Sequence, residues 1–263
     1  MEEKNVKQCC AAFYGSDVAR FLLGDSFHPG GTKLTHEIAE RLHLGPASRV
    51  LDVATGRGTS ALYVAEMFGC EVVGVDLSED NITLARQEAV TRGLDARVRF
   101  ELSDAESLSF PECTFDAVLC ECAFCTFPDK TAAAGEFYRV LRPGGCVGIS
   151  DLTKAAGPLP GLEGLLAWIA CIGDAQPLNS YADWLKGANF EVTETHDRSE
   201  CLDEMVKQTR GKLLLAEVMI GLKKLDAPGL DIQQAKEFAQ AASIALHKTQ
   251  LGYAVLIASK PIL

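Results

Sequence analysis

The chain has 263 residues, of which 48% are apolar and 23% are charged, so it is long enough to build one large hydrophobic core. This composition excludes a disordered or fibrous protein. Acidic residues outnumber basic ones by 36 to 25, and the net charge of −11 argues against a nucleic-acid partner. The first residues lack the pattern of a signal peptide, and no apolar stretch approaches the ~20 residues of a membrane span. We therefore expect a cytoplasmic protein with no membrane partner.

Short β-branched runs alternate with amphipathic stretches from residue 50 onward, a pattern that predicts an α/β fold with a doubly wound, mostly parallel sheet. Seven strands are expected, at residues 49–53, 71–75, 97–101, 115–121, 145–150, 190–195 and 252–259. Helices are expected at residues 59–69, 78–93 and 129–145, the last of which ends in a Pro-Gly-Gly stop.

The chain divides into two expected parts. Residues 1–45 predict an N-terminal helical extension or lid, interrupted at residues 28–31, because the sequence HPGG cannot continue a helix. Residues 46–263 predict one domain, with a helical insertion at about residues 200–250 before the last strand. The apolar run at residues 213–222 favours a buried helix, with a homodimer face as the alternative.

The strongest local motif is VLDVATGRGTS at residues 50–60, where a buried strand runs into a glycine turn that opens a helix. Gly56 and Gly58 allow positive φ angles and a close approach of backbone to a ligand. Asp76 ends the second strand 24 residues beyond Asp52, near the spacing at which an acidic side chain meets ribose hydroxyls. The alternative is a glycine turn that occurs by chance in an α/β protein.

Three later features add to this motif: Asp104 at the end of the third strand, FDAVLCE at the fourth, and RVLRPGG before the fifth. In this order the residues resemble the class I S-adenosylmethionine-dependent methyltransferases, over roughly residues 45–151. The resemblance implies a transferase of EC 2.1.1 type with a seven-stranded Rossmann-like sheet and S-adenosyl-L-methionine as cofactor. A dehydrogenase fits less well, because the loop reads DVATGRG rather than GxGxxG.

The resemblance also implies a set of cofactor-binding residues. They are Asp52, Ala54, Thr55, Gly56 and Gly58 at the methionine end, Asp76 and Leu77 at the ribose, Asp104 and Ala105 at the adenine, and Glu121. The sequence departs from the family at Ala54, which replaces the first glycine of the motif with a methyl group that narrows the pocket.

Ten cysteines are present, and in a reducing compartment we expect free thiols rather than a disulfide framework. The only CxxC pair is Cys122 with Cys125, and no paired histidines follow it, so a structural zinc site is not expected. Cys122, Cys125 and Cys171 fall on loops expected to face the methyl donor. Thiols gathered there suggest a soft acceptor such as trivalent arsenic.

A narrower resemblance supports that hypothesis. ECAFCTFPDK and CIGDAQPLNSYADWLKGANF resemble two segments of arsenite S-adenosylmethionine methyltransferases. The resemblance implies that Cys122 and Cys171 bind arsenic as the substrate, that Cys125 is a further catalytic candidate, and that a thiol reductant takes part. Cys9 and Cys10, before Tyr14, are weaker counterparts of that family's N-terminal cysteines.

Two other hypotheses remain open. In the first, the acceptor is a small organic molecule that is methylated on nitrogen, oxygen or carbon, the cysteines only pack, and Glu121, His28 or Tyr14 assists. In the second, the chain is a cofactor-binding sensor or thiol-binding protein without turnover. Packing is the expected role of five further cysteines: Cys70, Cys113, Cys120, Cys146 and Cys201.

Overall fold

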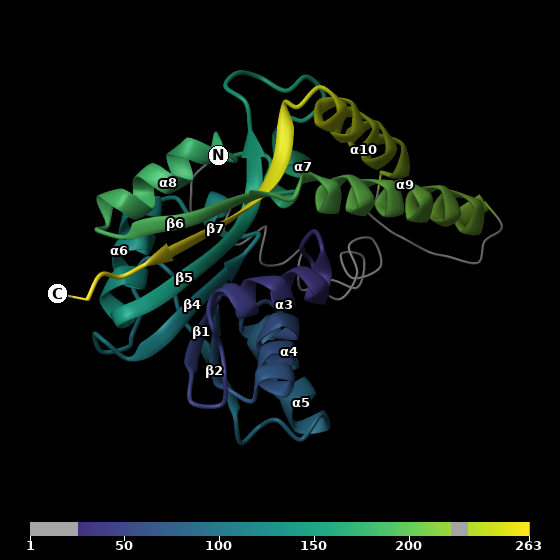
Figure 1. The fold of residues 1–263 in the computed structure, drawn as a ribbon. Coiled ribbons are helices and arrows are strands. Elements are labelled where there is room, and N and C mark those ends of the chain that lie inside the picture. The colour runs from purple at the N-terminus through teal and green to yellow at the C-terminus, as the bar shows by residue number, and fades with distance from the viewer. Residues whose placement is uncertain (1–25, 222–230, 263) are drawn as a thin grey trace.

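One seven-stranded sheet organises the part of the chain that the computed structural model describes, residues 26–221 and 231–262 (Figure 1). The strand order is β3-β2-β1-β4-β5-β7-β6, and neighbouring strands are parallel except in the two pairs that include β7. The strands are Arg49–Val53 (β1), Glu71–Asp76 (β2), Val98–Leu102 (β3), Phe115–Glu121 (β4), Leu141–Lys154 (β5), Glu191–Asp197 (β6) and Leu251–Ser259 (β7). The prediction of a doubly wound, mostly parallel α/β sheet of seven strands is confirmed.

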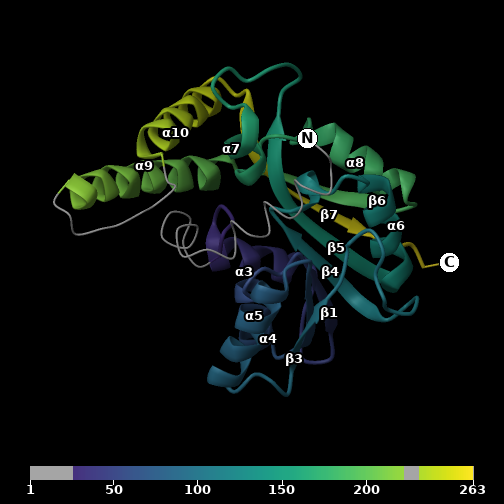
Figure 2. The same ribbon diagram turned by 180° about the vertical axis from the view of Figure 1, so that it is seen from behind.

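Helices cover both faces of the sheet. Figures 1 and 2 show α3, α4 and α5 on one face and α6 and α8 on the other, while α9 and α10 form a pair beside α7. The helices are Gly31–Arg41 (α3), Thr59–Phe68 (α4), Glu79–Thr91 (α5), Lys130–Val140 (α6), Gly164–Ile169 (α7), Leu178–Gly187 (α8), Ser199–Gly221 (α9) and Ile232–His247 (α10). A short 3-10 helix, Phe124–Thr126 (η1), follows β4.

Some element boundaries differ from the sequence-based expectation. The helix expected over residues 129–145 ends at Val140, because β5 begins at Leu141 and includes the Pro-Gly-Gly segment. Leu141 pairs with Phe115 before a shift in register, after which Cys146 pairs with Ala117. The sequence analysis did not identify α7 and α8. Residues 1–25 of the expected helical extension and 222–230 of the expected insertion lie outside the described residues, and α3 begins directly after HPGG.

The central strands explain where the site lies. Val50, Leu51 and Val53 of β1 are at most 1% exposed, as is typical of a parallel strand covered by helices on both faces. Polar residues interrupt this apolar sequence toward the carboxyl ends of the strands, with Asp52 in β1 and Glu121 at the end of β4. Ligands of open α/β sheets bind at this edge, where neighbouring connections leave in opposite directions.

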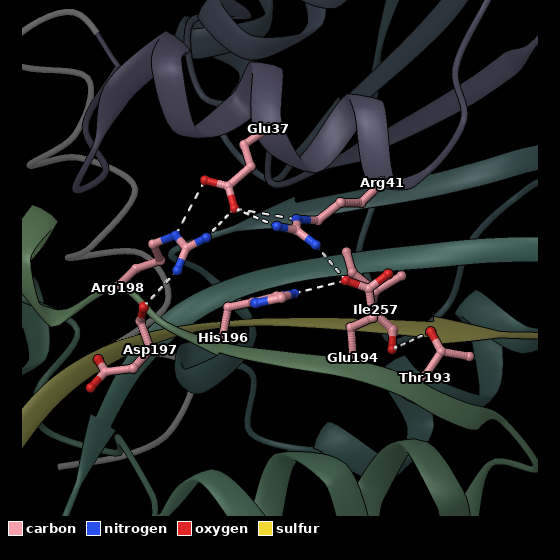
Figure 3. A network of polar contacts seen from close by, with 8 residues as sticks. All are labelled: Glu37, Arg41, Thr193, Glu194, His196, Asp197, Arg198 and Ile257. Carbon is pink, nitrogen blue, oxygen red and sulfur yellow. Dashed lines mark hydrogen bonds and ion pairs between the residues drawn. The ribbon is translucent and has the colours of Figure 1, made fainter.

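An ion-pair network joins α3 to β6 and the residue before α9 (Figure 3). Glu37 of α3 accepts hydrogen bonds from Arg41 and from Arg198, and Arg41 also pairs with Glu194 of β6. His196 contacts the same Glu194 carboxylate at 2.7 Å. The hydrogen bond from Arg198 is the main cause that lowers the pKa of Glu37. The network thus links α3 to β6 and to the residue before α9.

In the described ranges, none of the helices combines the length and apolar character needed to cross a membrane.

Candidate active site

A cavity of about 150 Å³ lies at the carboxyl ends of β1, β2 and β4. We call it the acidic cavity, because its described lining includes four carboxylates, Asp52, Asp76, Asp104 and Glu121. Its other lining residues relevant here are Phe27, His28, Ala54, Thr55, Gly56, Ser60, Leu77, Asn81, Ala105, Cys122 and Cys171. The structure therefore brings together most of the residues that the sequence analysis singled out.

The glycine turn after β1 has two glycines with different roles. Gly56 lines the cavity at φ +56°, and a Cβ built on it would meet only Phe27, at 3.9 Å. Gly58 does not line the cavity: at φ +80°, a Cβ there would lie 2.5 Å from Cζ of Phe100, in the core. The expectation that Gly58 contacts the cofactor therefore needs correction, since its hydrogen atom permits close packing of α4 against β3.

Asp76 is held in place by the backbone around it. Its Oδ2 accepts from the Gly56 N–H at 2.9 Å, and its Oδ1 accepts from the Ser78 N–H at 2.8 Å. Burial raises the pKa of the Asp76 carboxyl despite these donors. Asn81, in the first turn of α5, is 2% exposed, and its Oδ1 has no hydrogen-bond partner among the described residues. An unsatisfied buried acceptor that lines a cavity is suited to a ligand donor.

Asp52 lies in β1, just before the glycine turn, and is almost completely buried. Thr55 Oγ1 donates to its Oδ2 at 2.5 Å. Burial raises the pKa of Asp52 to about 8, and the neighbouring Glu121 and Asp76 act in the same direction. Asp52 is therefore mainly a neutral carboxylic acid at pH 7 in this state.

A polar cluster surrounds Glu121, which also lines the acidic cavity. Its carboxylate accepts hydrogen bonds from Ser60 at 2.6 Å and from Thr35 at 3.1 Å. His28 Nε2 lies 3.5 Å from Oε2 of Glu121, and both side chains are 4% exposed. His28 Nδ1 lies 3.2 Å from the carbonyl of Pro29, which fixes the ring from its other side. The cluster joins the segment before α3 to β4.

The three cysteines proposed to bind a thiophilic acceptor are close together but differ in access. Cys122 and Cys171 line the acidic cavity, and the Cys171 thiol donates to the Cys122 carbonyl at 3.3 Å. Cys125 lines neither described cavity: it is fully buried in η1, and its thiol donates to the Cys171 carbonyl at 3.3 Å. This placement does not agree with direct contact between Cys125 and substrate.

Two of these thiols, those of Cys122 and Cys125, have pKa values raised above the ordinary thiol value. The hydrogen bond with Cys171, with burial second, raises the pKa of the Cys122 thiol, and burial is the main cause that raises that of Cys125. Within the described ranges, no three His, Cys, Asp or Glu side chains are arranged to hold a metal ion.

The other cysteines vary in burial. Cys70 and Cys120 are buried, as a packing role requires, while Cys146 and Cys201 are half-buried and Cys113 is exposed, so the expectation of packing is wrong for Cys113. Cys9, Cys10 and Tyr14 lie outside the described residues.

Strained backbone gathers around the acidic cavity. Four of its lining residues that carry a Cβ have a positive φ: Phe27 at 55°, Ala54 at 57°, Cys122 at 53° and Cys171 at 59°. Such conformations cost about 1–2 kcal/mol each and tend to persist at functional sites, where the surrounding structure enforces them. Their concentration here supports the assignment of this cavity as the site.

A second cavity of about 150 Å³ adjoins the first, and Phe27 and Cys122 line both. We call it the apolar cavity. Its remaining lining residues are Pro29, Leu152, Leu166, Ala170, Ile172, Leu202, Met205, Val206, Thr209, Leu213, Ala235, Phe238, Ala239, Ala242 and Leu251. The sequence analysis did not predict this cavity.

Comparisons with known proteins agree with this geometry. Residues 50–145 match the family described as "Methyltransferase domain". The chain carries a class I S-adenosylmethionine-dependent methyltransferase domain. It is 32% identical over 200 residues to phosphoethanolamine N-methyltransferase 3 of Arabidopsis thaliana, covering 74% of this chain and 40% of that protein. Methyltransferase GfsG of Streptomyces halstedii is 29% identical over 244 residues, covering 90% of this chain and 83% of that protein.

Solved structures show the same fold. Phosphoethanolamine N-methyltransferase 2 of Haemonchus contortus, in complex with phosphomonomethylethanolamine and S-adenosylhomocysteine, superposes with a TM-score of 0.81 at 21% identity, covering 97% of this chain and 60% of that one. The [4+2]-cyclase SpnF gives a TM-score of 0.80 at 24% identity, covering 98% of this chain and 97% of that one. Because one of these neighbours is a cyclase, the fold alone does not define the reaction.

The chain spans about two-fifths or less of the length of the plant phosphoethanolamine N-methyltransferases that it matches.

S-Adenosylmethionine is the cofactor of this domain class, and the acidic cavity fits it. The cofactor carries a positive sulfonium, a positive ammonium group and one carboxylate, and the described lining has four acidic side chains but no lysine or arginine. The free Oδ1 of Asn81 offers an acceptor to one of its hydroxyl or amino groups. Sequence reasoning missed Asn81 and Ser60, although Asn81 follows the Ser78 helix cap at a spacing that places it in the first turn of α5.

Proposed function

We propose that this protein transfers a methyl group from S-adenosylmethionine to a small organic acceptor. The observation that carries the proposal is the meeting of two cavities at Phe27 and Cys122, one lined by carboxylates and the other without them. Methyl transfer needs the cofactor and the acceptor held against each other, and two adjoining cavities provide that arrangement. The matches to methyltransferases with organic acceptors support the same conclusion.

When bound, the cofactor supplies an electrophilic methyl group: the acceptor's electron pair bonds to the methyl carbon, the C–S bond breaks, and its electron pair stays on sulfur. The chain's own residues orient the ligands and remove the acceptor proton. In this proposal Asp76 binds the ribose hydroxyls, with Asp104 and Ala105 near the adenine. The proton passes to the His28–Glu121 pair, whose side chains both line the acidic cavity.

The structure favours this proposal over arsenite as acceptor. Trivalent arsenic displaces the proton of each thiol that binds it, and the raised pKa values of the Cys122 and Cys125 thiols make that proton harder to remove. Cys125 is also removed from both cavities. The relatives named above act on organic molecules where their names state a substrate.

The test is an assay with methyl-labelled S-adenosylmethionine. Label is expected to enter organic alcohols, phenols or amines, and arsenite with excess thiol is expected to remain unmethylated. Binding of S-adenosylhomocysteine is measured separately by calorimetry, where Asp76→Ala is expected to weaken affinity by about 2 kcal/mol. Methylated arsenic as the product, or unchanged affinity in Asp76→Ala, would contradict the proposal.

A further inference from the structure

We infer that the apolar cavity selects an uncharged, largely hydrocarbon acceptor and excludes phosphorylated amines. The inference rests on the proposed function and names the substrate class of the same site. It separates this protein from the phosphoethanolamine N-methyltransferases that its sequence matches.

The lining of the apolar cavity carries the argument. None of the described residues that line it is charged, and Thr209 and Cys122 are its only side chains with a polar atom other than the thioether of Met205. A phosphate group brought into such a cavity would lose hydration without gaining an arginine or lysine partner from the described lining. A hydrocarbon gains from the same lining, at about 25 cal/mol for each Å² of apolar surface removed from water.

The position of the cavity determines which end of the acceptor reacts. Its walls come from α9, α10, α7 and the adjoining parts of β5 and β7, and Phe27 and Cys122 form its boundary with the acidic cavity. A molecule in the apolar cavity therefore presents one end to the methyl donor at this boundary. The His28–Glu121 pair lines the acidic cavity beyond it, where a hydroxyl or amine at that end can lose its proton. The acceptor is accordingly an apolar body with one reactive polar atom at its end.

The two cavities differ in the charge of their described lining residues: acidic side chains line the first, and no charged side chain lines the second. The acidic cavity suits a cofactor with a net positive charge and disfavours a phosphate, because its described lining has acidic side chains and no lysine or arginine. A phosphorylated acceptor would be disfavoured by the apolar cavity through desolvation and by the acidic cavity through charge. An uncharged acceptor meets neither penalty.

The experiment uses N-phenyl-1-naphthylamine, an uncharged fluorescent hydrocarbon-like probe, with the full chain saturated with S-adenosylhomocysteine. Saturable fluorescence is expected, with displacement by 1-decanol and none by phosphoethanolamine. Val206→Phe fills the cavity from α9 and is expected to weaken probe binding at least tenfold. Val218→Phe makes the same change on the same helix at a side chain that is 58% exposed, and is expected to bind the probe like the unchanged protein.

A second variant, Ala235→Leu, fills the cavity from α10 and answers the question if Val206→Phe does not fold. The inference is overturned if phosphoethanolamine displaces the probe, or if the folded cavity-filling variants bind the probe as tightly as Val218→Phe. Calorimetry with S-adenosylhomocysteine keeps the two proposals separate. If the unchanged protein does not bind S-adenosylhomocysteine, the proposed function is rejected. If it binds S-adenosylhomocysteine but phosphoethanolamine displaces the probe, only the acceptor class is rejected.

Discussion

The Ser60 hydroxyl donates a 2.6 Å hydrogen bond to Glu121 Oε2 and so joins the first turn of α4 to the end of β4. Glu121→Ala removes an acceptor shared by Ser60, Thr35 and His28, all of them buried. We expect the free energy of unfolding to fall by about 2 kcal/mol, because three buried side chains lose their shared carboxylate partner. Urea denaturation measures this loss. Glu71→Ala, at the exposed start of β2, is the control and should change stability by less than about 0.5 kcal/mol.

The two glycines of the turn should respond differently to alanine. Gly58→Ala places a Cβ 2.5 Å from Phe100 at a positive φ and should cost about 3 kcal/mol of folding stability. Gly56→Ala meets no close atom, so it should cost only about 1 kcal/mol and should instead weaken S-adenosylhomocysteine binding. Denaturation and calorimetry on both variants separate the effects. Equal stability losses would show that the distinction is wrong.

Ala54 has a φ of 57°, which glycine adopts without strain. Ala54→Gly removes a strain of about 1–2 kcal/mol and adds about 0.5–1 kcal/mol of chain entropy cost, so we expect the protein to become about 0.5 kcal/mol more stable. Ala132→Gly, inside α6, should have the opposite sign and cost about 1 kcal/mol. A thermal unfolding scan of the two variants checks the signs, and destabilisation by Ala54→Gly would refute the strain argument.

Two buried carboxyls should make the ligand-free protein less stable as pH rises. Burial raises the pKa of Asp52 to about 8 and that of Asp151 to about 7, from 3.8 in both cases. The native state therefore holds protons that the unfolded chain releases above pH 4. Stability from these groups is complete below about pH 4 and is lost as pH rises toward 7–8, with a limiting slope of about 1.4 kcal/mol per pH unit for each group.

Denaturation between pH 5 and 7.5 tests this dependence, and Asp52→Asn should remove about half of the slope. Stability that rises with pH across this interval would contradict the assignment.

The contact between Glu37 and Arg198 should be weak and sensitive to salt. Their side chains are 31% and 21% exposed, so solvent screens the pair. Glu37→Gln is expected to cost less than about 1 kcal/mol at low salt and almost nothing in 1 M NaCl. Parallel urea titrations at the two salt concentrations measure the difference, and a large loss at both would show that the network acts through packing.

Local sequence was sufficient to predict the frame of the site. The buried strand followed by Gly56 and the acidic residue at the end of the second strand predict the positions of β1, β2 and Asp76, because turn geometry and strand ends depend on nearby residues. Gly58 was misassigned because its constraint comes from Phe100, which is distant in sequence.

The acceptor side could not be predicted in the same way. The chemistry of Cys125 suggested a ligand, but η1 turns this residue into the core, and nothing in ECAFCTFPDK specifies that orientation. The apolar cavity depends on how α9 and α10 pack against β5 and β7. Helical periodicity predicts that a helix has an apolar face, but it does not predict whether that face packs tightly or leaves space for a ligand.

The position of β7 has a consequence during synthesis. Among the described strands, β6 pairs only with β7, yet the ribosome makes β6 first, followed by α9 and α10. Until residues 251–259 emerge, β6 has no neighbouring strand and β5 keeps an open edge of unpaired amide and carbonyl groups, which other nascent chains can join. The half of the sheet that carries the glycine turn can form early. The half that borders the apolar cavity must wait, and this waiting period is when the chain is most exposed to aggregation.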